Sequence, residues 1–329
     1  MFNFNISQSS NIDLIFLMVG GLSVFLFGLN ITKENLKKLS SNHLNKLIDK
    51  CTDNNFKAFL TGLITTILIQ SSSGVCAIAI TLIASGHLTF KKGLGIMIGS
   101  NLGTCISSFL FGINIEEYSL IIIVIGALFF FPSKKLKTQL ISQIIIGIGL
   151  LFLGLHLMGS AFEIMANQPK FSHLIIQYVN NNFISFLIGI LITFIIQSSS
   201  AIIGVLEKIY ASDLISLSPA ILLILGSNIG TTLTSFISTI NTNKDARKAV
   251  VANVLFNIIG AILFIIILPI FIKFLIFFKS QNIIRSKELM IAFAHLIFNL
   301  VSVILGYIFI NQLINLTNFI TNEKKKNHS

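Results

Sequence analysis

Charged residues are scarce in this sequence: they make up 11% of its 329 residues, against about 25% in a soluble domain. So few charges cannot cover the surface of a water-soluble fold, which excludes a soluble enzyme and a disordered chain. Apolar residues make up 54% of the chain, and insertion into lipid gives this excess a favourable environment. The apolar runs are long and continuous, whereas strands of a membrane β-barrel alternate polar and apolar residues. The sequence therefore predicts an all-α, polytopic membrane protein.

Cysteine is rare and tryptophan is missing. The three cysteines, Cys51, Cys76 and Cys105, form no C-x-x-C pair, which argues against a disulfide-bonded secreted scaffold and against a cysteine metal site. The chain has 30 phenylalanines, which we interpret as bulk that faces lipid rather than as part of a cofactor site. We expect no bound cofactor.

The apolar segments are long enough to predict several membrane-spanning helices, because one crossing needs about 20 residues. No cleavable signal is evident, and the first segment is interpreted as a first span. The segments are 13–31, 58–83, 90–113, 118–132, 140–165, 183–210, 216–240, 248–278 and 289–318.

The formal net charge of +11 would suggest a nucleic acid partner in a soluble protein. Here the lysines lie between the apolar runs, where the positive-inside rule places them. We therefore expect a lipid bilayer and no nucleic acid as the partner. Loop 32–57 and the lysines at 324–326 are predicted to be cytoplasmic, and Glu116 and loop 166–182 to lie outside. Loop 279–288 is basic but falls outside in this topology, which conflicts with the rule.

Two apolar segments are interrupted at their midpoints by the same polar cluster. Segment 58–83 contains Q-S-S-S at 70–73, and segment 183–210 contains Q-S-S-S at 197–200. Each arm has about 12 residues, or about 18 Å of helix, which is roughly half of a bilayer. We predict two re-entrant hairpins whose tips lie near the membrane midplane.

These clusters belong to an internal repeat with an offset of 127 residues. The sequence G-S-N-L-G-T at 99–104 follows the first Q-S-S-S cluster, and G-S-N-I-G-T at 226–231 follows the second at the same spacing. Upstream, glycines match at an offset of 126: Gly21 and Gly28 with Gly147 and Gly154. By the predicted topology the two halves begin on opposite sides of the membrane, as in the inverted repeats of many secondary transporters.

The repeat predicts how the chain is organised. We expect a single transport domain over 1–329, with repeat 1 at about 13–113 and repeat 2 at about 140–240. A linking span at 118–132 joins the repeats, and two spans within 248–318 follow them.

The buried amides of the clusters argue for a ligand. Gln70, Gln197, Asn101 and Asn228 would each cost several kcal/mol in hydrocarbon without partners, and small-residue helix packing does not explain them. Hydroxyls and helix N-termini can bind an oxyanion, while hydroxyl, amide and carbonyl oxygens can coordinate Na⁺. The repeats contain no buried arginine, so accompanying cations would supply positive charge. Moving a dianion into a cell with a negative interior costs an electrical free energy of about 4.6 kcal/mol per 100 mV. Two monovalent cations that enter with the dianion cancel this cost.

With its paired Q-S-S-S motifs, each followed by G-S-N-x-G-T, the sequence closely resembles the bacterial branch of the sodium–phosphate cotransporter family. The resemblance covers about residues 13–318. The resemblance implies a symporter of the bacterial cytoplasmic membrane that imports inorganic phosphate with Na⁺ as the coupling ion. A carrier that exports phosphate, or one for another small oxyanion, is the alternative. Many bacterial relatives carry a further cytoplasmic domain of the phosphate-uptake regulator type, so we expect any such regulatory protein to act in trans. The sequence does not indicate an oligomeric state.

The resemblance also implies the site residues, with individual Na⁺ ligands unassigned: Gln70, Ser71, Ser72, Ser73, Gln197, Ser198, Ser199 and Ser200, with Asn101, Thr104, Asn228 and Thr231 in the same pocket and Thr66 and Thr193 as further candidates.

Other classes fit the sequence less well. An ion channel predicts a continuous polar stripe along several helices, whereas the polar clusters are isolated. A non-transporting membrane scaffold or sensor predicts that Gln70 and Gln197 are dispensable for phosphate movement. No nucleophile–base pair is visible, so we expect no enzyme. Glu207 and Lys208 are predicted at the membrane interface, and His295 in a structural hydrogen bond between the last spans.

Overall fold

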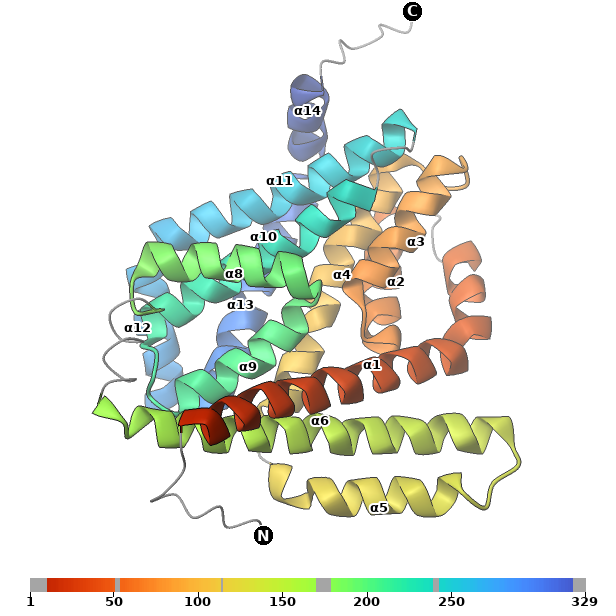
Figure 1. The fold of residues 1–329 in the computed structure, drawn as a ribbon. Coiled ribbons are helices and arrows are strands. Elements are labelled where there is room, and N and C mark those ends of the chain that lie inside the picture. The colour runs from red at the N-terminus through yellow and green to blue at the C-terminus, as the bar shows by residue number, and fades with distance from the viewer. Residues whose placement is uncertain (1–10, 51–53, 114, 170–178, 239–242, 322–329) are drawn as a thin grey trace, which may run out of the picture.

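The computed structural model describes residues 11–50, 54–113, 115–169, 179–238 and 243–321. Within these residues every regular element is a helix (Figure 1), as predicted. Cys51, the lysines at 324–326 and most of the predicted outer loop 166–182 lie outside the described residues. The helices are α1 (Asn11–Lys50), α2 (Asn55–Ile69), α3 (Ser72–Ala84), α4 (Phe90–Phe111), the 3-10 helix η2 (Glu116–Tyr118), α5 (Ser119–Phe130), α6 (Leu136–Ala166), α8 (Asn182–Ile196), α9 (Ser199–Ala211), α10 (Leu217–Ser238), α11 (Lys244–Ile266), α12 (Leu268–Ser280), α13 (Lys287–Ile308) and α14 (Ile310–Ile320).

Side chains of asparagine and serine begin several of these helices. Asn and Ser are favoured at this position because their oxygens accept an N–H group that the first turn leaves unpaired. Asn54 accepts the N–H of Lys57 at 2.8 Å, and Asn243 accepts that of Ala246 at 2.9 Å. Ser286 begins α13 in the same way.

Six helices in the described part of the chain are long and apolar enough to cross a membrane, so the chain is a multi-pass membrane protein. Each of the six overlaps a predicted apolar segment, and the first extends nine residues beyond the predicted end at residue 31. They are Ile12–Ser40, Phe90–Phe111, Leu136–Ala166, Leu217–Phe236, Lys244–Ile266 and Lys287–Ile308.

Three predicted spans differ from the structure. Segment 118–132 forms only the 12-residue helix α5, which at about 18 Å is shorter than the hydrocarbon core of about 30 Å. Segment 248–278 divides between α11 and α12, where Pro269 near the start of α12 lacks the N–H that a continuous helix would need. Segment 289–318 also divides, between α13 and α14 at Phe309, and no proline marks that break.

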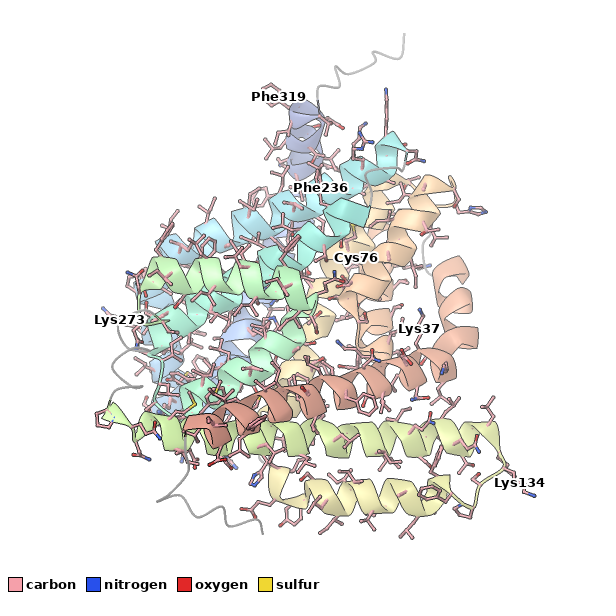
Figure 2. The ribbon with its side chains drawn as sticks, in the orientation of Figure 1. Lys37, Cys76, Lys134, Phe236, Lys273 and Phe319 are labelled. Atoms are coloured by element: carbon pink, nitrogen blue, oxygen red, sulfur yellow. The ribbon has the colours of Figure 1, made fainter. Side chains whose placement is uncertain are left out.

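Helices α1 and α6 lie side by side, and α5 covers the opposite side of α6 (Figure 1). Glycine makes the contact between α1 and α6 close. A Cβ atom on Gly21 would lie 3.0 Å from the carbonyl oxygen of Gly154, and one on Gly154 would lie 2.5 Å from the carbonyl oxygen of Gly21. Figure 2 shows Lys134 at the turn that joins α5 to α6.

The two halves also make matching contacts elsewhere. A Cβ on Gly62 would meet the backbone of Ile96, and one on Gly189 would meet the backbone of Leu223. Gly189 lies 127 residues after Gly62, and Leu223 lies 127 residues after Ile96. Helix α2 therefore packs on α4 in the way that α8 packs on α10.

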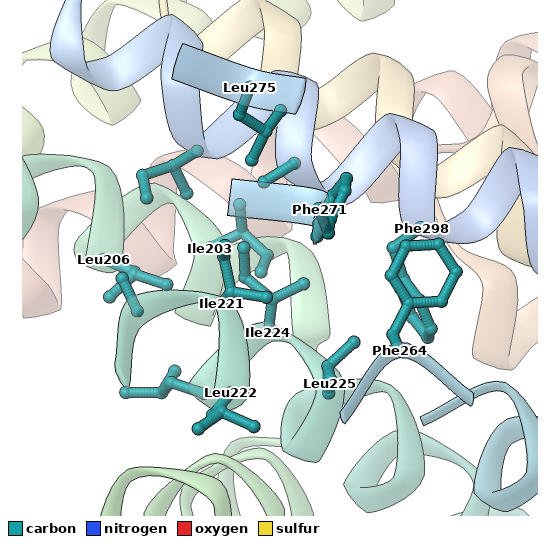
Figure 3. Packing of buried hydrophobic residues seen from close by; sticks show 14 of the residues in the cluster. Ile203, Leu206, Ile221, Leu222, Ile224, Leu225, Phe264, Phe271, Leu275 and Phe298 are labelled. Atoms are coloured by element: carbon teal, nitrogen blue, oxygen red, sulfur yellow. The ribbon is translucent and has the colours of Figure 1, made fainter. Parts of the chain in front are cut away.

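A large apolar core lies in the second half, among α9, α10, α11, α12 and α13 (Figure 3). In this core Phe264 packs edge to face with Phe271 at 4.9 Å and with Phe298 at 5.1 Å between ring centroids. Other apolar side chains point outward, including Leu128 and Phe129 on α5, as expected for a surface that faces lipid.

Candidate functional site

Each Q-S-S-S cluster forms a break between two helices. Gln70 ends α2 in the left-handed conformation with φ +57°, and its N–H donates to the carbonyl oxygen of Thr66 at 2.7 Å. Gln197 ends α8 with φ +58° and makes the same bond to Thr193 at 2.7 Å. A glutamine in this conformation is uncommon, and strained backbone of this kind concentrates at functional sites.

The serine after each glutamine caps the following helix. Ser71 accepts the N–H of Gly74 at 3.2 Å at the start of α3. Ser198 accepts the N–H of Ala201 at 3.4 Å at the start of α9. The N-termini of α3 and α9 therefore lie at the two breaks, and helix N-termini attract anions through their free N–H groups and the helix dipole.

The two breaks meet in one small cavity of about 20 Å³. A cavity of this size holds about one water-sized sphere, so a tetrahedral oxyanion requires the two tips to move apart. Its lining brings together most of the residues that the sequence singled out. The lining residues are Gln70, Ser71, Ser72, Ser73, Thr104, Gln197, Ser198, Ser199 and Ser200, together with Lys33 and Ser107.

Lys33 is the charged residue of the cavity, and sequence reasoning missed it. It was assigned to a cytoplasmic loop, but α1 continues as a helix to Lys50. The Lys33 ammonium donates to the Ser198 hydroxyl at 3.1 Å, and no carboxylate among the described residues pairs with it. The sequence beyond residue 31 contains no proline or glycine before Lys50, and this absence of helix breakers was the signal that could have placed Lys33 on a continuous helix. Lys33 therefore brings a positive charge to a cavity whose other lining residues are uncharged.

Ser107 is a second residue that the sequence analysis missed. Its hydroxyl bonds with the side-chain oxygen of Gln70, which fixes the amide at the first break. Thr234 matches Ser107 in the second half and donates instead to the carbonyl oxygen of Thr231 at 2.7 Å. The two halves therefore contribute unequally to the cavity.

Several predicted site residues lie outside the cavity lining. Asn228 donates to the side chain of Asn299 at 3.2 Å, and the side-chain nitrogen of Asn101 is buried without a partner. Thr231 donates to the carbonyl oxygen of Ser227 at 3.0 Å. The cavity lining does not include these three residues, and their role in binding stays a prediction.

Thr66 and Thr193, at matched positions of the repeat, are also outside the cavity lining. Each packs against a glycine of the G-S-N-x-G-T motif, Thr66 on Gly103 and Thr193 on Gly230. Both hydroxyl oxygens are buried without a hydrogen-bond partner. Unpartnered hydroxyl oxygens next to helix breaks are groups that could coordinate a hard cation.

Glu207 and Lys208 are buried inside the protein, with 0% and 5% of each residue exposed, and their place at the membrane interface stays a prediction. One further prediction needs correction. His295 does not bond between the last spans: its Nδ1 lies 2.7 Å from the hydroxyl of Ser108 on α4. Burial behind neighbouring helices was not visible from the sequence.

Two matched helix breaks thus meet at one polar cavity in a multi-pass membrane protein. The sequence model of the family described as Na+/Pi-cotransporter matches residues 24–160 and 161–303. These stretches make up most of the chain, which therefore belongs to the Na+/Pi-cotransporter family.

The curated relatives are bacterial. The chain is 29% identical to the "Uncharacterized protein YqeW" of Bacillus subtilis over 247 residues, which cover 73% of this chain and 78% of that protein. It is 24% identical to the "Putative inorganic phosphate export protein YjbB" of Escherichia coli K12 over 284 residues, which cover 86% of this chain and 51% of that protein. The chain thus spans about half the length of YjbB. No solved structure matches the chain.

Proposed function

We propose that this protein is a secondary active symporter of the bacterial cytoplasmic membrane that imports inorganic phosphate together with Na⁺ by alternating access. One observation carries the proposal: both Q-S-S-S breaks and the unpaired ammonium of Lys33 converge on one cavity. Serine hydroxyls, helix N-termini and an ammonium are the groups that bind an oxyanion. The family to which the chain belongs supports phosphate as that anion.

Coupling to Na⁺ is the finer part of the proposal. The hydroxyl oxygens of Thr66 and Thr193, buried and without partners, support cation sites beside the cavity. The energetic argument is independent of the site: movement of a dianion into a negative interior needs compensating cations. Lys33 neutralises part of the anion charge while phosphate is bound. Because Lys33 is not transported, it does not reduce the net charge that is carried across the membrane.

The test is uptake of labelled phosphate into proteoliposomes, with and without an inward Na⁺ gradient. We expect uptake that requires Na⁺ and that is lost in the double variant Gln70→Ala, Gln197→Ala. Gln139→Ala is the matched control, because Gln139 bonds to Ser133 at the turn before α6 and should leave uptake unchanged. Equal uptake by the double variant would contradict the site, and no phosphate flux under any gradient would contradict the substrate.

Phosphate export is the second candidate, because the relative YjbB is named for inorganic phosphate export. The two directions share one site and differ in coupling. Proteoliposomes loaded with labelled phosphate distinguish them: efflux that ignores the Na⁺ gradient supports an exporter. Efflux that slows when external Na⁺ is raised supports the symporter.

A further inference from the structure

A larger cleft leads into the cavity between α1 and α3. It has a volume of about 500 Å³ and shares Lys33 and Ser71 with the cavity. Lys37 also lines it and lies on α1 (Figure 2). Because the cleft and the cavity share lining residues, this cleft is an access route to the site. Its two lysines outnumber its one acidic residue, Glu34, which favours an anion. By the predicted topology it opens on the cytoplasmic side, where segment 32–57 is predicted to lie.

The internal repeat places a second, matching region between α6 and α9. An offset of 126 carries α1 onto α6, and an offset of 127 carries α3 onto α9. Lys33 on the first side matches Gly159 on the second, and Thr81 matches Lys208. The first region therefore carries its lysines, Lys33 and Lys37, on the α1 wall, whereas the second carries Lys208 on the α9 wall.

The second region is filled by side chains rather than open. The Lys208 side chain runs past Gly159, where an added Cβ would lie 3.5 Å from its Cδ atom. Phe111 and Phe25 cover Gly204, at 2.9 and 3.2 Å from the position of a Cβ. Gly204 matches Ala77, which lines the open cleft. The same architecture is thus open on one side of the site and closed on the other.

Ion pairs hold the closed side together. The Lys208 ammonium pairs with the carboxylate of Glu116 and lies 3.3 Å from that of Glu288. These contacts join α9 to η2 and to the first turn of α13. Burial raises the pKa of the Glu116 carboxyl above its ordinary value, while the Lys208 ammonium acts in the opposite direction. The predicted topology places η2 and the start of α13 on the outer side, opposite the open cleft.

We propose that Lys208, held by Glu116 and Glu288, is the gate of a second access cleft between α6 and α9. The cleft opens when these ion pairs separate and Phe25 and Phe111 leave Gly204, while the first cleft closes. This inference rests on the proposed function, since alternating access needs two routes to one site. It adds the residues that close the second route.

Thiol labelling tests the gate without any transport measurement. The three native cysteines are replaced by alanine, and one reporter is added: Ile78→Cys in the open cleft or Val205→Cys at the matched position of the closed one. A membrane-impermeant thiol reagent is applied to vesicles opened by freezing and thawing, so that it reaches both faces. We expect rapid labelling of the reporter at 78 and slow labelling of the reporter at 205.

Two gate variants are then added to the Val205→Cys chain. Glu116→Gln with Glu288→Gln removes both partners of Lys208, and Lys208→Thr installs the residue found at the matched position of the open cleft. Each should accelerate labelling about tenfold, which corresponds to about 1.4 kcal/mol. Glu117→Gln, an exposed neighbour of Glu116, is the control and should change nothing.

Two outcomes overturn the gate. One is rapid labelling of Val205→Cys without any gate variant. The other is an unchanged rate in Lys208→Thr, in a protein whose Ile78→Cys reporter still reacts as before and is therefore folded. Because the reagent needs no phosphate, failure of the gate is distinguishable from failure of the substrate assignment.

Discussion

Gly28 of α1 and Gly147 of α6 face each other backbone to backbone. A Cβ on Gly28 would lie 2.6 Å from the carbonyl oxygen of Gly147, and a Cβ on Gly147 would lie 2.8 Å from the carbonyl oxygen of Gly28. Gly21 and Gly154 make the same kind of contact. In the repeat, Gly147 is the counterpart of Gly21, and Gly154 is the counterpart of Gly28. Gly28 therefore contacts the counterpart of Gly21, and Gly21 contacts the counterpart of Gly28. Reciprocal contacts of this kind are what a two-fold relation between the halves produces.

Gly28→Ala should destabilise the protein by about 1–3 kcal/mol, the usual cost of overpacking. Gly20→Ala is the matched control on the same helix, because no atom lies within 4 Å of its added Cβ. The control should be neutral or more stable by up to about 1 kcal/mol, since alanine favours a helix. Thermal unfolding in detergent measures both, and equal midpoints for the two variants would contradict the close approach of α1 and α6.

Lys33→Gln should lower phosphate uptake at limiting phosphate by about tenfold to a hundredfold. This range follows from the loss of a charged hydrogen bond of about 1.5–3 kcal/mol. Lys33→Arg keeps the charge and should retain part of the activity. Lys37→Gln is the control, because Lys37 lines the open cleft but not the cavity. If both glutamine variants behave alike, Lys33 acts only by general attraction of anions.

Thr66→Val should raise the Na⁺ concentration needed for half-maximal uptake several-fold without changing the thermal midpoint. The hydroxyl has no protein partner, so its removal leaves no group unsatisfied. Thr65→Val is the control: its hydroxyl is also buried and unpartnered, but its match in the second half is Ile192. The Na⁺ dependence of phosphate uptake measures the effect. Identical curves for the two variants would remove Thr66 from the list of Na⁺ ligands.

Glu207→Ile should leave the protein as stable as the native chain, or more stable by about 1–3 kcal/mol. Both carboxyl oxygens of Glu207 are buried without a partner, and removal of an unsatisfied buried group relieves its desolvation penalty. Isoleucine is chosen because Ile80 occupies the matched position and is buried. A clear fall in the thermal midpoint would mean that Glu207 has a stabilising partner.

The sequence predicts the helical class and the two helix breaks well because each depends on local pattern. Long apolar runs identify the spanning helices, and the repeated Q-S-S-S clusters lead directly to both helix breaks. Of the four residues that the resemblance places in the same pocket, Thr104 lines the cavity. These features need no knowledge of which helices become neighbours.

What the sequence does not predict depends on neighbours from distant parts of the chain. Lys33 joins the cavity only because α1 crosses the second helix break, 165 residues away. Lys208 is buried because Glu116 and Glu288 come from two other segments. The division at Pro269 could have been predicted from the proline, whereas the end of α13 at Ile308 has no comparable local signal.

The cavity has a consequence for the origin of the chain. Each half supplies one helix break, so neither half encloses a cavity by itself. A single ancestral copy could complete such a site only by pairing with a second copy inserted into the membrane in the opposite orientation. Within one chain each half can differ from the other, and the lysines at 33 and 208, which match Gly159 and Thr81, are positions where the halves do differ.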